Sequence, residues 1–318
     1  ITMAFDVLIL TNYTAENQFP LMRKTVLGAK MMSLATVVPS IKGPSKLPQI
    51  AQTIFFQEDG CSFNASGDTA FSQRTLTPGK VKINDSWCPK DLEPKYFAQE
   101  MRAGAHYENV TPEYVWQSIM EEYADKVSNV VDVAVWQGDT VSGSGNNSHW
   151  DGFITLLSSG TTDADPSNTI SDLGVPSQAV DAQWLVYNSA SLLGLTQYDD
   201  FRVFVGYDDY AALVQGLNDN SITYGTMVDG TNGDKNVEGQ GLTMFGTNLK
   251  VIPVAGLTGQ NKLYAGRLSN FFVGVDAEGD FTNFQTWYSQ DDRVVKLAIE
   301  FKLGCQVAFP DEIITIIP

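Results

Sequence analysis

A periodic pattern of apolar residues between positions 111 and 138 predicts one long helix. Apolar side chains recur there at helical spacing, which places them on one face: Val115, Ile119, Tyr123, Val127, Val131 and Val135. Thr111 and Pro112 are residue types favoured at the N-cap and the first helical position, and Gly138 is typical of a helix end. A helix of this length measures roughly 40 Å, so shorter elements can pack along it.

Alternating apolar and polar residues before this helix predict a long β-hairpin. Its outgoing arm is expected at Pro48–Glu58 and its return arm at Phe71–Trp87, where Leu76, Val81 and Ile83 fall on one face. The polar, glycine-containing segment between the arms would form the turn. Because a two-stranded ribbon is only marginally stable in water, its apolar residues need cover. Either the same domain or a neighbouring copy could supply it.

The residues that flank these two elements show weaker patterns. Residues 1–33 mix apolar and polar residues without a regular period, and one short helix is expected after Pro20, ending at Gly28. Asp91–Gly104 is predicted as a short helix that leads into the long one. The opening segment has no core of its own, so it too needs a covering surface.

The pattern of apolar and polar residues in the second half of the chain predicts a mixed α/β domain followed by late strands. The glycine- and serine-rich loop after Gly138 marks the strongest break in composition. Beyond it we expect helices at Ala179–Tyr187 and Asp208–Leu217, and buried strands at Phe201–Val205 and Lys250–Val254. Three late strands are expected at Phe284–Tyr288, Val294–Phe301 and Cys305–Phe309. These strands must pair with a sheet. If they join the sheet beside the long helix, the chain returns to its first domain at the end, and the second domain is an insertion in the first.

Charge excludes some classes of partner. The 318 residues contain 37 acidic and 20 basic side chains, a formal net charge of −17. This balance opposes direct binding to DNA or to anionic lipid, because neutralising phosphates requires clustered Lys and Arg. No apolar run approaches the roughly 18 residues of a membrane span. Three cysteines in a chain of this length indicate reduced thiols, although a Cys61–Cys88 bridge across the hairpin is an alternative.

No catalytic motif is present in the sequence. The two histidines lack a zinc-binding pattern, and neither a nucleophile elbow nor a phosphate-binding loop occurs. Pairs of aspartates at 199–200, 208–209 and 291–292 are the best candidates for cation binding or acid–base chemistry. A helix start explains the pair at 208–209 more simply. We therefore expect no catalytic residue, no cofactor and no metal, and keep a hydrolase that uses an Asp pair as an alternative.

The order of the parts resembles that of the major capsid proteins of tailed bacteriophages, which have the Hong Kong 97-like fold. The resemblance rests on FSQRTLTPGKVKINDSWCPKDLEPKYFAQEMRAG (71–104), on VWQGD (135–139), on GLTMFGTNLKVIPVAGLTGQNKLYAGRLSNFFVGVD (241–276) and on WYSQDDRVVKLAIEFKLGCQVAFPDEIITI (287–316). It covers nearly the whole chain. The sequences of these segments are most similar to those of capsid proteins from phages that infect Bacteroidetes-type hosts.

The resemblance implies an α+β fold built from four named parts. These are an N-terminal arm (1–40), an extended β-hairpin loop (41–88), a peripheral domain (89–138 and 282–302) with a spine helix at 111–138, and an inserted axial α/β domain (139–281 and 303–318). In some relatives a lysine on the extended loop forms a covalent link to another subunit. The tip at Asp59–Ala70 has no lysine, so we expect no such link here.

The resemblance also implies a function as a structural subunit. The chain would self-assemble as hexamers and pentamers of an icosahedral capsid that encloses double-stranded DNA without sequence-specific binding. It would occur in the virion after assembly in the host bacterial cytoplasm, with no membrane, beside other virion proteins such as portal or decoration proteins. The alternatives are an encapsulin-like cellular compartment and, in another class, a secreted binding or adhesion module. Candidate inter-subunit contacts are Phe19, Arg23, Lys24, Phe55, Phe56, Phe71, Arg74 and Leu76.

Overall fold

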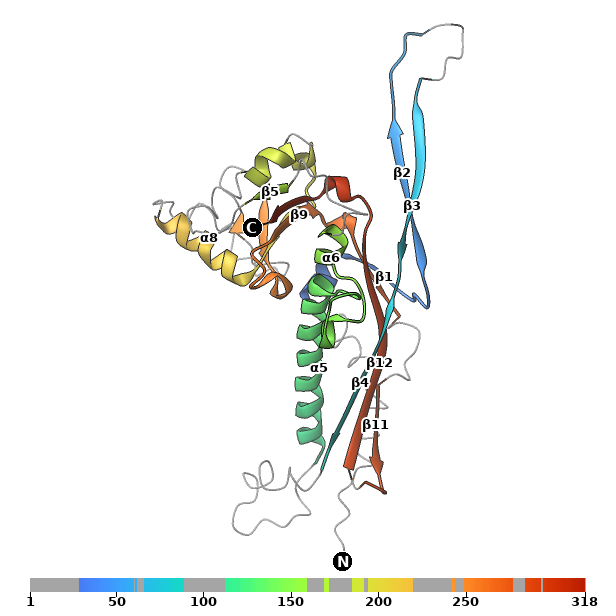
Figure 1. Cartoon of the computed structure of the whole chain (residues 1–318), viewed down its shortest axis with the longest axis vertical. Coiled ribbons are helices and arrows are strands. Elements are labelled where there is room, and N and C mark those ends of the chain that lie inside the picture. Colours follow the sequence, from blue (N-terminus) through green and yellow to red (C-terminus); the bar gives the residue numbers. More distant parts are fainter. Residues whose placement is uncertain are drawn as a thin grey trace, which may run out of the picture.

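The computed structural model describes residues 29–59, 61, 66–88, 112–158, 169–171, 185–191, 194–219, 242–243, 249–276, 284–292 and 294–317. Two sheets, one long helix and a projecting two-stranded ribbon make up this part of the chain (Figure 1). The α+β class expected from the sequence is confirmed. Predictions for residues 1–28, including the helix after Pro20, and for 91–104 lie outside the described residues.

The long helix α5 spans Pro112–Gln137, as its apolar period predicted. On the predicted face, Val127, Val131 and Val135 are buried, whereas Ile119 and Tyr123 are half-buried. Met120 and Ala124 are also buried on this helix, since they lie one residue beyond Ile119 and Tyr123 and so widen the apolar stripe. The helix therefore presents a broad apolar face to the neighbouring sheet.

The first sheet packs against α5. Its strands follow the order β1 (Thr36–Val38), β10 (Phe271–Val275), β12 (Val294–Val307) and β11 (Phe284–Ser289), and β4 (Gly79–Trp87) also pairs with β12. Alternate side chains of β12, such as Val295, Leu297 and Ile299, are buried in the core that includes α5, as the period of two along a strand requires. The late strands thus join the sheet beside the long helix, as expected. The two separate strands predicted at Val294–Phe301 and Cys305–Phe309 were wrong, because β12 runs without a break to Val307.

The predicted return arm of the hairpin is two strands rather than one. Only β3 (Asp68–Leu76) pairs with the outgoing strand β2 (Ser45–Thr53). The chain then passes Pro78, which has no backbone N–H to continue the ladder, and enters β4, which pairs with β12. The prediction of one arm over Phe71–Trp87 was therefore wrong beyond Leu76.

The second sheet carries helix α8 (Tyr207–Asp219). Its order is β5 (Thr169–Ser171), β13 (Ile314–Ile317), β9 (Leu263–Arg267), β6 (Phe201–Val205), β8 (Lys250–Pro253) and β7 (Leu242–Thr243). The predictions of β6, β8 and α8 are confirmed to within a few residues. Residues 185–191 are helical, so the helix expected at Ala179–Tyr187 is confirmed only at its end, and its first part lies outside the described residues.

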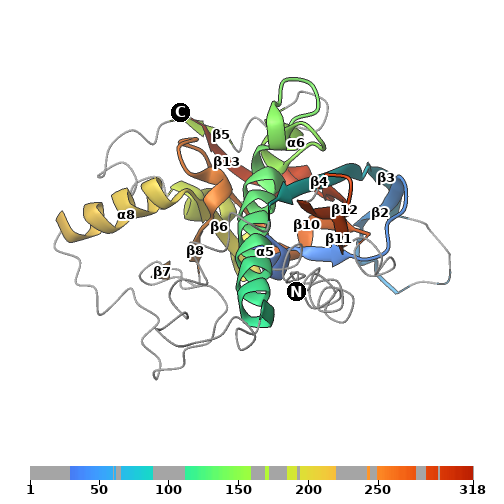
Figure 2. The same cartoon turned by 90° about the horizontal axis from the view of Figure 1, so that it is seen from below.

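Short 3-10 helices connect the two sheets. One, η9 (Leu268–Asn270), leads from β9 to β10, and the other, η10 (Pro310–Glu312), leads from β12 to β13. Seen from below, α5 lies between the first sheet and the second sheet with α8 (Figure 2). The predicted domain boundaries remain predictions, but β10 and the end of β12, both expected in the axial part, lie in the first sheet.

The aromatic side chain of Trp136 fills the junction between the two sheets. It lies on the last turn of α5 and contacts Phe153, Phe204, Tyr264 and Phe271, with ring centroids 5.3 to 6.2 Å apart. Aromatic pairs at this separation add to the free energy gained by burial. One continuous core therefore holds both sheets against the helix.

No described helix is both long enough and apolar enough to cross a membrane. The three cysteines are free.

Candidate functional site

The ribbon β2–β3 is the most exposed apolar feature of the described chain. Nine residue pairs join its strands, from Ser45 opposite Leu76 to Thr53 opposite Asp68. Beyond its base the ribbon projects away from both sheets (Figure 1). Nothing in the described part of the chain covers its outer half, where large apolar side chains are exposed: Ile50, Ile54, Phe55, Phe56 and Phe71.

The exposure of these phenylalanines is far above that of a core residue. Phe55 is 61% exposed, Phe71 is 76% exposed and Phe56 is fully exposed. Burying one such side chain contributes about 1.5–3 kcal/mol. Large contiguous exposed apolar surfaces usually mark sites of interaction. The three phenylalanines named from the sequence therefore lie where another molecule can reach them, but whether they contact another subunit stays a prediction.

The base of the ribbon, by contrast, is fixed to its own chain. Leu76 is fully buried against Ile41 and Leu47. The Gln306 Nε2 atom also donates a hydrogen bond to the Thr75 carbonyl oxygen at 2.8 Å. The interpretation of Leu76 as an inter-subunit contact is corrected by this burial, because a side chain without exposed surface cannot meet a neighbour. Leu76 anchors the ribbon instead.

Arg74 is half-buried, and its own chain supplies an acidic side chain nearby. Burial lowers the pKa of Arg74, and the Asp311 carboxylate opposes that shift. A contact between Arg74 and another subunit therefore remains a prediction. The other contact candidates, Phe19, Arg23 and Lys24, lie outside the described residues.

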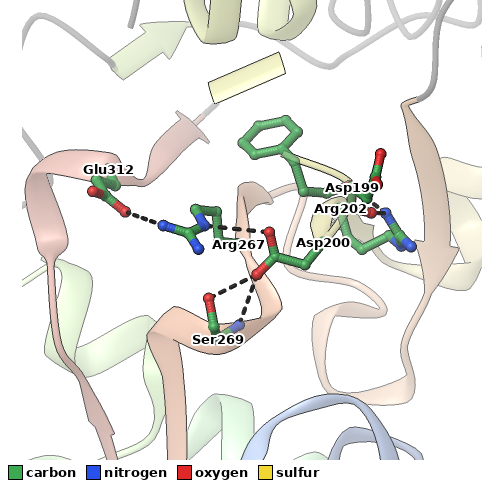
Figure 3. A network of polar contacts seen from close by, with 7 residues as sticks. Asp199, Asp200, Arg202, Arg267, Ser269 and Glu312 are labelled. Carbon is green, nitrogen blue, oxygen red and sulfur yellow. Dashed lines mark hydrogen bonds and ion pairs between the residues drawn. The ribbon is translucent and has the colours of Figure 1, made fainter. Parts of the chain in front are cut away.

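A second polar feature links η9, η10 and the residue before β6 (Figure 3). The Arg267 guanidinium lies between two carboxylates, with Nε 3.2 Å from Asp200 Oδ1 and one terminal nitrogen 4.0 Å from Glu312 Oε2. The Ser269 hydroxyl donates to Asp200 Oδ2 at 2.7 Å. The Arg267 guanidinium also stacks over the Tyr198 ring at 4.0 Å. Together these contacts connect three segments that are far apart in sequence.

The two carboxylates of this network have opposite pKa shifts. Burial alone would raise the pKa of Asp200, but hydrogen bonds from Ser269 and Arg267 outweigh it and hold the pKa below its usual value. Burial raises the pKa of Glu312, and the longer contact with Arg267 only partly opposes this rise. The site thus contains one firmly ionised acid, Asp200, and one more readily protonated acid, Glu312. This arrangement is consistent with a structural contact between chain segments.

The aspartate pairs named from the sequence take part in separate local contacts. Asp200 belongs to the network of Figure 3, and Asp208 Oδ2 accepts a hydrogen bond from the Gly259 backbone N–H at 2.8 Å. Asp292 accepts a hydrogen bond from Lys296. Among the residues that the structure describes, no three acidic, histidine or cysteine side chains group as metal ligands. The structure therefore brings no two of these pairs together into one site.

Sequence reasoning missed the residues that connect distant segments. Asn270, Arg267 and Asp132 carry no local pattern, because their partners lie far along the chain. Asp132, for example, is buried in α5 and accepts a hydrogen bond from the Met31 N–H at 2.9 Å. Ile50 and Ile54 of the ribbon were also missed, although they belong to an apolar stretch that lacks basic residues.

The fold resembles that of solved chains from phages and from a GTA particle. A chain of Microbacterium phage Oxtober96 is 16% identical, with a TM-score of 0.54 and 91% of each chain covered. A chain from the procapsid of satellite phage P4 with its size determination (Sid) protein is 11% identical, with a TM-score of 0.55 over 99% of this chain and 92% of that one. A chain from the capsid of a native GTA particle is 11% identical, with a TM-score of 0.50 over 92% and 89%.

At these identities the likeness concerns the fold, which this chain shares over nearly its whole length with a chain of a phage, a chain of a satellite phage procapsid and a chain of a GTA capsid. No protein-family model and no curated protein matches the sequence.

Proposed function

We propose that this chain is the structural subunit of an icosahedral bacteriophage capsid. The observation that carries the proposal is the ribbon β2–β3, which exposes Phe55, Phe56 and Phe71 and gives them no cover from the described part of its own chain. A neighbouring copy that covered these three side chains would gain roughly 5 kcal/mol or more. The fold shared with a chain of a phage and with a chain of a satellite phage procapsid supports the same conclusion.

The arrangement of elements fits the parts of the Hong Kong 97-like fold. In this proposal the ribbon is the extended loop, α5 is the spine helix, the first sheet belongs to the peripheral domain and the second sheet belongs to the axial domain. Residues 1–40 act as the arm. Copies assemble as hexamers and pentamers, and each copy touches several others, so many modest contacts add up to a stable shell.

The charge of the chain fits a container for DNA. At a net charge of −17 the protein repels nucleic acid over most of its surface. It therefore encloses double-stranded DNA without sequence-specific binding, and its role is structural rather than catalytic. The proposed location is the virion of a phage, with Bacteroidetes-type bacteria as hosts, after assembly in the host cytoplasm. Portal or decoration proteins complete the particle.

Electron microscopy of the purified full-length chain tests this function. We expect closed particles of uniform diameter, and a chain that stays monomeric at every protein and salt concentration would contradict the proposal. The contents of particles isolated from producing cells separate two kinds of shell. Double-stranded DNA protected from nuclease indicates a phage capsid, whereas a packaged enzyme without DNA indicates an encapsulin-like compartment.

A further inference from the structure

A buried carboxylate on α5 holds two short helices that lie far apart in the sequence. Asp132 is only 5% exposed. Its Oδ1 atom accepts a hydrogen bond at 2.9 Å from the Met31 N–H of α3 (Lys30–Leu34). The same carboxylate accepts a hydrogen bond from the backbone of Ala255, the first residue of η8 (Ala255–Leu257). Since the first amides of a helix have no partner inside it, one side chain satisfies an amide of each element.

Neither short helix can supply this partner from its own N-cap. The N-cap residues are Ala29 for α3 and Val254 for η8, and neither forms a side-chain cap hydrogen bond. Alanine and valine have no side-chain oxygen, which is what a capping residue normally contributes. A helix as short as α3 is also unstable by itself in water. Both elements therefore depend on Asp132 of α5.

The side chain of Lys30 forms a second link between the same segments. Its Nζ atom donates a hydrogen bond to the carbonyl oxygen of Pro253, the last residue of β8, at 2.6 Å. It also lies 5.8 Å from the centroid of the Tyr207 ring at the start of α8, a distance at which a cation is attracted to a ring face. Lys30 thus joins α3 directly to the second sheet, while Asp132 joins both to α5.

The two charges stabilise each other in a partly dehydrated setting. Burial raises the pKa of Asp132, and the Met31 hydrogen bond and the Lys30 charge oppose this rise. Burial lowers the pKa of Lys30, and the Asp132 charge opposes that change. A buried charge that loses its partners is strongly unfavourable. If the second sheet moved away from α5, Asp132 would lose the Ala255 donor and Lys30 would lose its acceptor, so the contact with α3 would weaken too.

We propose that Lys30 and Asp132, the coupling pair, make the attachment of α3 to α5 depend on the attachment of the second sheet to α5. Such a dependence is reciprocal, because each attachment favours the other by the same free energy. Local opening equilibria are coupled in this way when the two segments share buried contacts. The inference goes beyond the proposed function and holds for a single copy. A contact made at β8 or η8 would then change the stability of α3.

Hydrogen–deuterium exchange of the full-length chain tests the coupling. Peptides that contain residues 29–35 and 254–258 report on α3 and η8. The variant Gln137→Ala acts on η8, because Gln137 Nε2 donates a hydrogen bond to the Gly256 carbonyl oxygen at 2.8 Å, and this bond involves no residue of α3. Wild type and variants are compared in the same state of association, which sedimentation velocity establishes.

A second variant, Ser33→Gly, acts on α3. It removes the hydrogen bond from the exposed Ser33 hydroxyl to the Lys30 carbonyl oxygen at 2.7 Å and lowers the helix propensity. The control Ser269→Ala removes a hydrogen bond of the same length to Asp200, in the network of Figure 3, which contains neither residue of the coupling pair. It reports on general destabilisation.

The same variants are then made in a chain that carries Lys30→Met with Asp132→Leu. This background replaces both charges by apolar side chains of similar size, a change that folded proteins often tolerate. In it, Gln137→Ala and Ser33→Gly should each affect only their own segment. Should the background chain not fold, the comparison in the otherwise wild-type chain still decides the question.

In the otherwise wild-type chain, we expect each variant to accelerate exchange in its own segment and about fivefold in the other. Ser269→Ala should leave both segments unchanged. Acceleration confined to the substituted segment would overturn the inference, and so would equal acceleration by Ser269→Ala, which would indicate global unfolding. The measurement does not require a shell. A chain that stayed monomeric would contradict the proposed function, whereas reciprocal exchange in that monomer would support the coupling.

Discussion

The side-chain amide of Asn270 satisfies both backbone groups of Phe309. Its Nδ2 atom donates to the Phe309 carbonyl oxygen at 2.6 Å, and its Oδ1 atom accepts from the Phe309 N–H at 2.6 Å. The Asn270 carbonyl oxygen also accepts from the Ala308 N–H at 3.1 Å. Asn270 is only 2% exposed. It thus joins the two connections between the sheets, η9 and the residues before η10. The ion pair of Arg267 with Glu312 links the same two connections (Figure 3).

Replacing Asn270 with alanine should destabilise the fold. The change leaves both backbone groups of Phe309 without their partner in a partly buried setting, and a buried group without a partner costs about 1–3 kcal/mol. We therefore expect the free energy of unfolding to fall by about 2–4 kcal/mol in urea titrations. Asn146→Ala, at an exposed position of the short 3-10 helix Gly145–Asn147, is the control and should change it little. Equal stability of the two variants would contradict this role of Asn270.

Polar substitutions at Phe55 and Phe56 should abolish association without unfolding the chain. These side chains contribute little to the isolated fold because they are exposed on the ribbon. We expect Phe55→Ser with Phe56→Ser to keep the wild-type melting temperature and to lose closed particles in electron micrographs. Val141→Ser also removes a highly exposed apolar residue, but away from the ribbon, and should assemble normally. A variant at Phe55 and Phe56 that assembled equally well would argue against the ribbon as a contact.

Two residues of strand β3 should respond in opposite ways to truncation. Leu76 is 0% exposed, and truncating a buried leucine typically costs about 2–5 kcal/mol. Phe71 lies on the same strand but is exposed. We expect Leu76→Ala to lower the melting temperature and Phe71→Ala to leave it unchanged while weakening association. Calorimetry combined with sedimentation separates the two effects, and a stable Leu76→Ala variant would show that the ribbon is not anchored as described.

Asp209 should make stability depend on pH. Burial, with help from the neighbouring Asp208 carboxylate, raises the pKa of Asp209 to about 6, and Oδ2 has no hydrogen-bond partner among the described residues. Because the folded state holds this proton more tightly than the unfolded state, ionisation penalises folding. The penalty is complete above about pH 6 and disappears as the pH falls towards the usual Asp value near 4.

Asp209→Asn should therefore stabilise the protein at neutral pH. We expect a gain of roughly 1 kcal/mol at pH 7.5 that shrinks as the pH falls from 6 towards 4. Melting curves across this range provide the measurement, with the exposed Asp291→Asn as the control. A gain that did not vary with pH would mean that the substitution acts through packing rather than through the proton.

Local sequence patterns were sufficient for the elements that are stabilised by their own neighbours. The spacing of Val127, Val131 and Val135 placed α5 correctly, because every third or fourth residue of a helix lies on one face. The exposed phenylalanines of the ribbon were found for a related reason. A two-stranded ribbon has no interior of its own, so their exposure could be argued before any coordinates.

The tertiary structure alone decided which strands pair and which residues are hidden. Leu76 and Phe71 are apolar residues on opposite faces of one alternating segment, and only the structure shows that the first is buried against Ile41 while the second is exposed. The break between β3 and β4 and the contact of Asn270 with Phe309 depend on segments more than 30 residues away. Periodicity reports which face of an element is apolar, whereas only the assembled chain determines what that face meets.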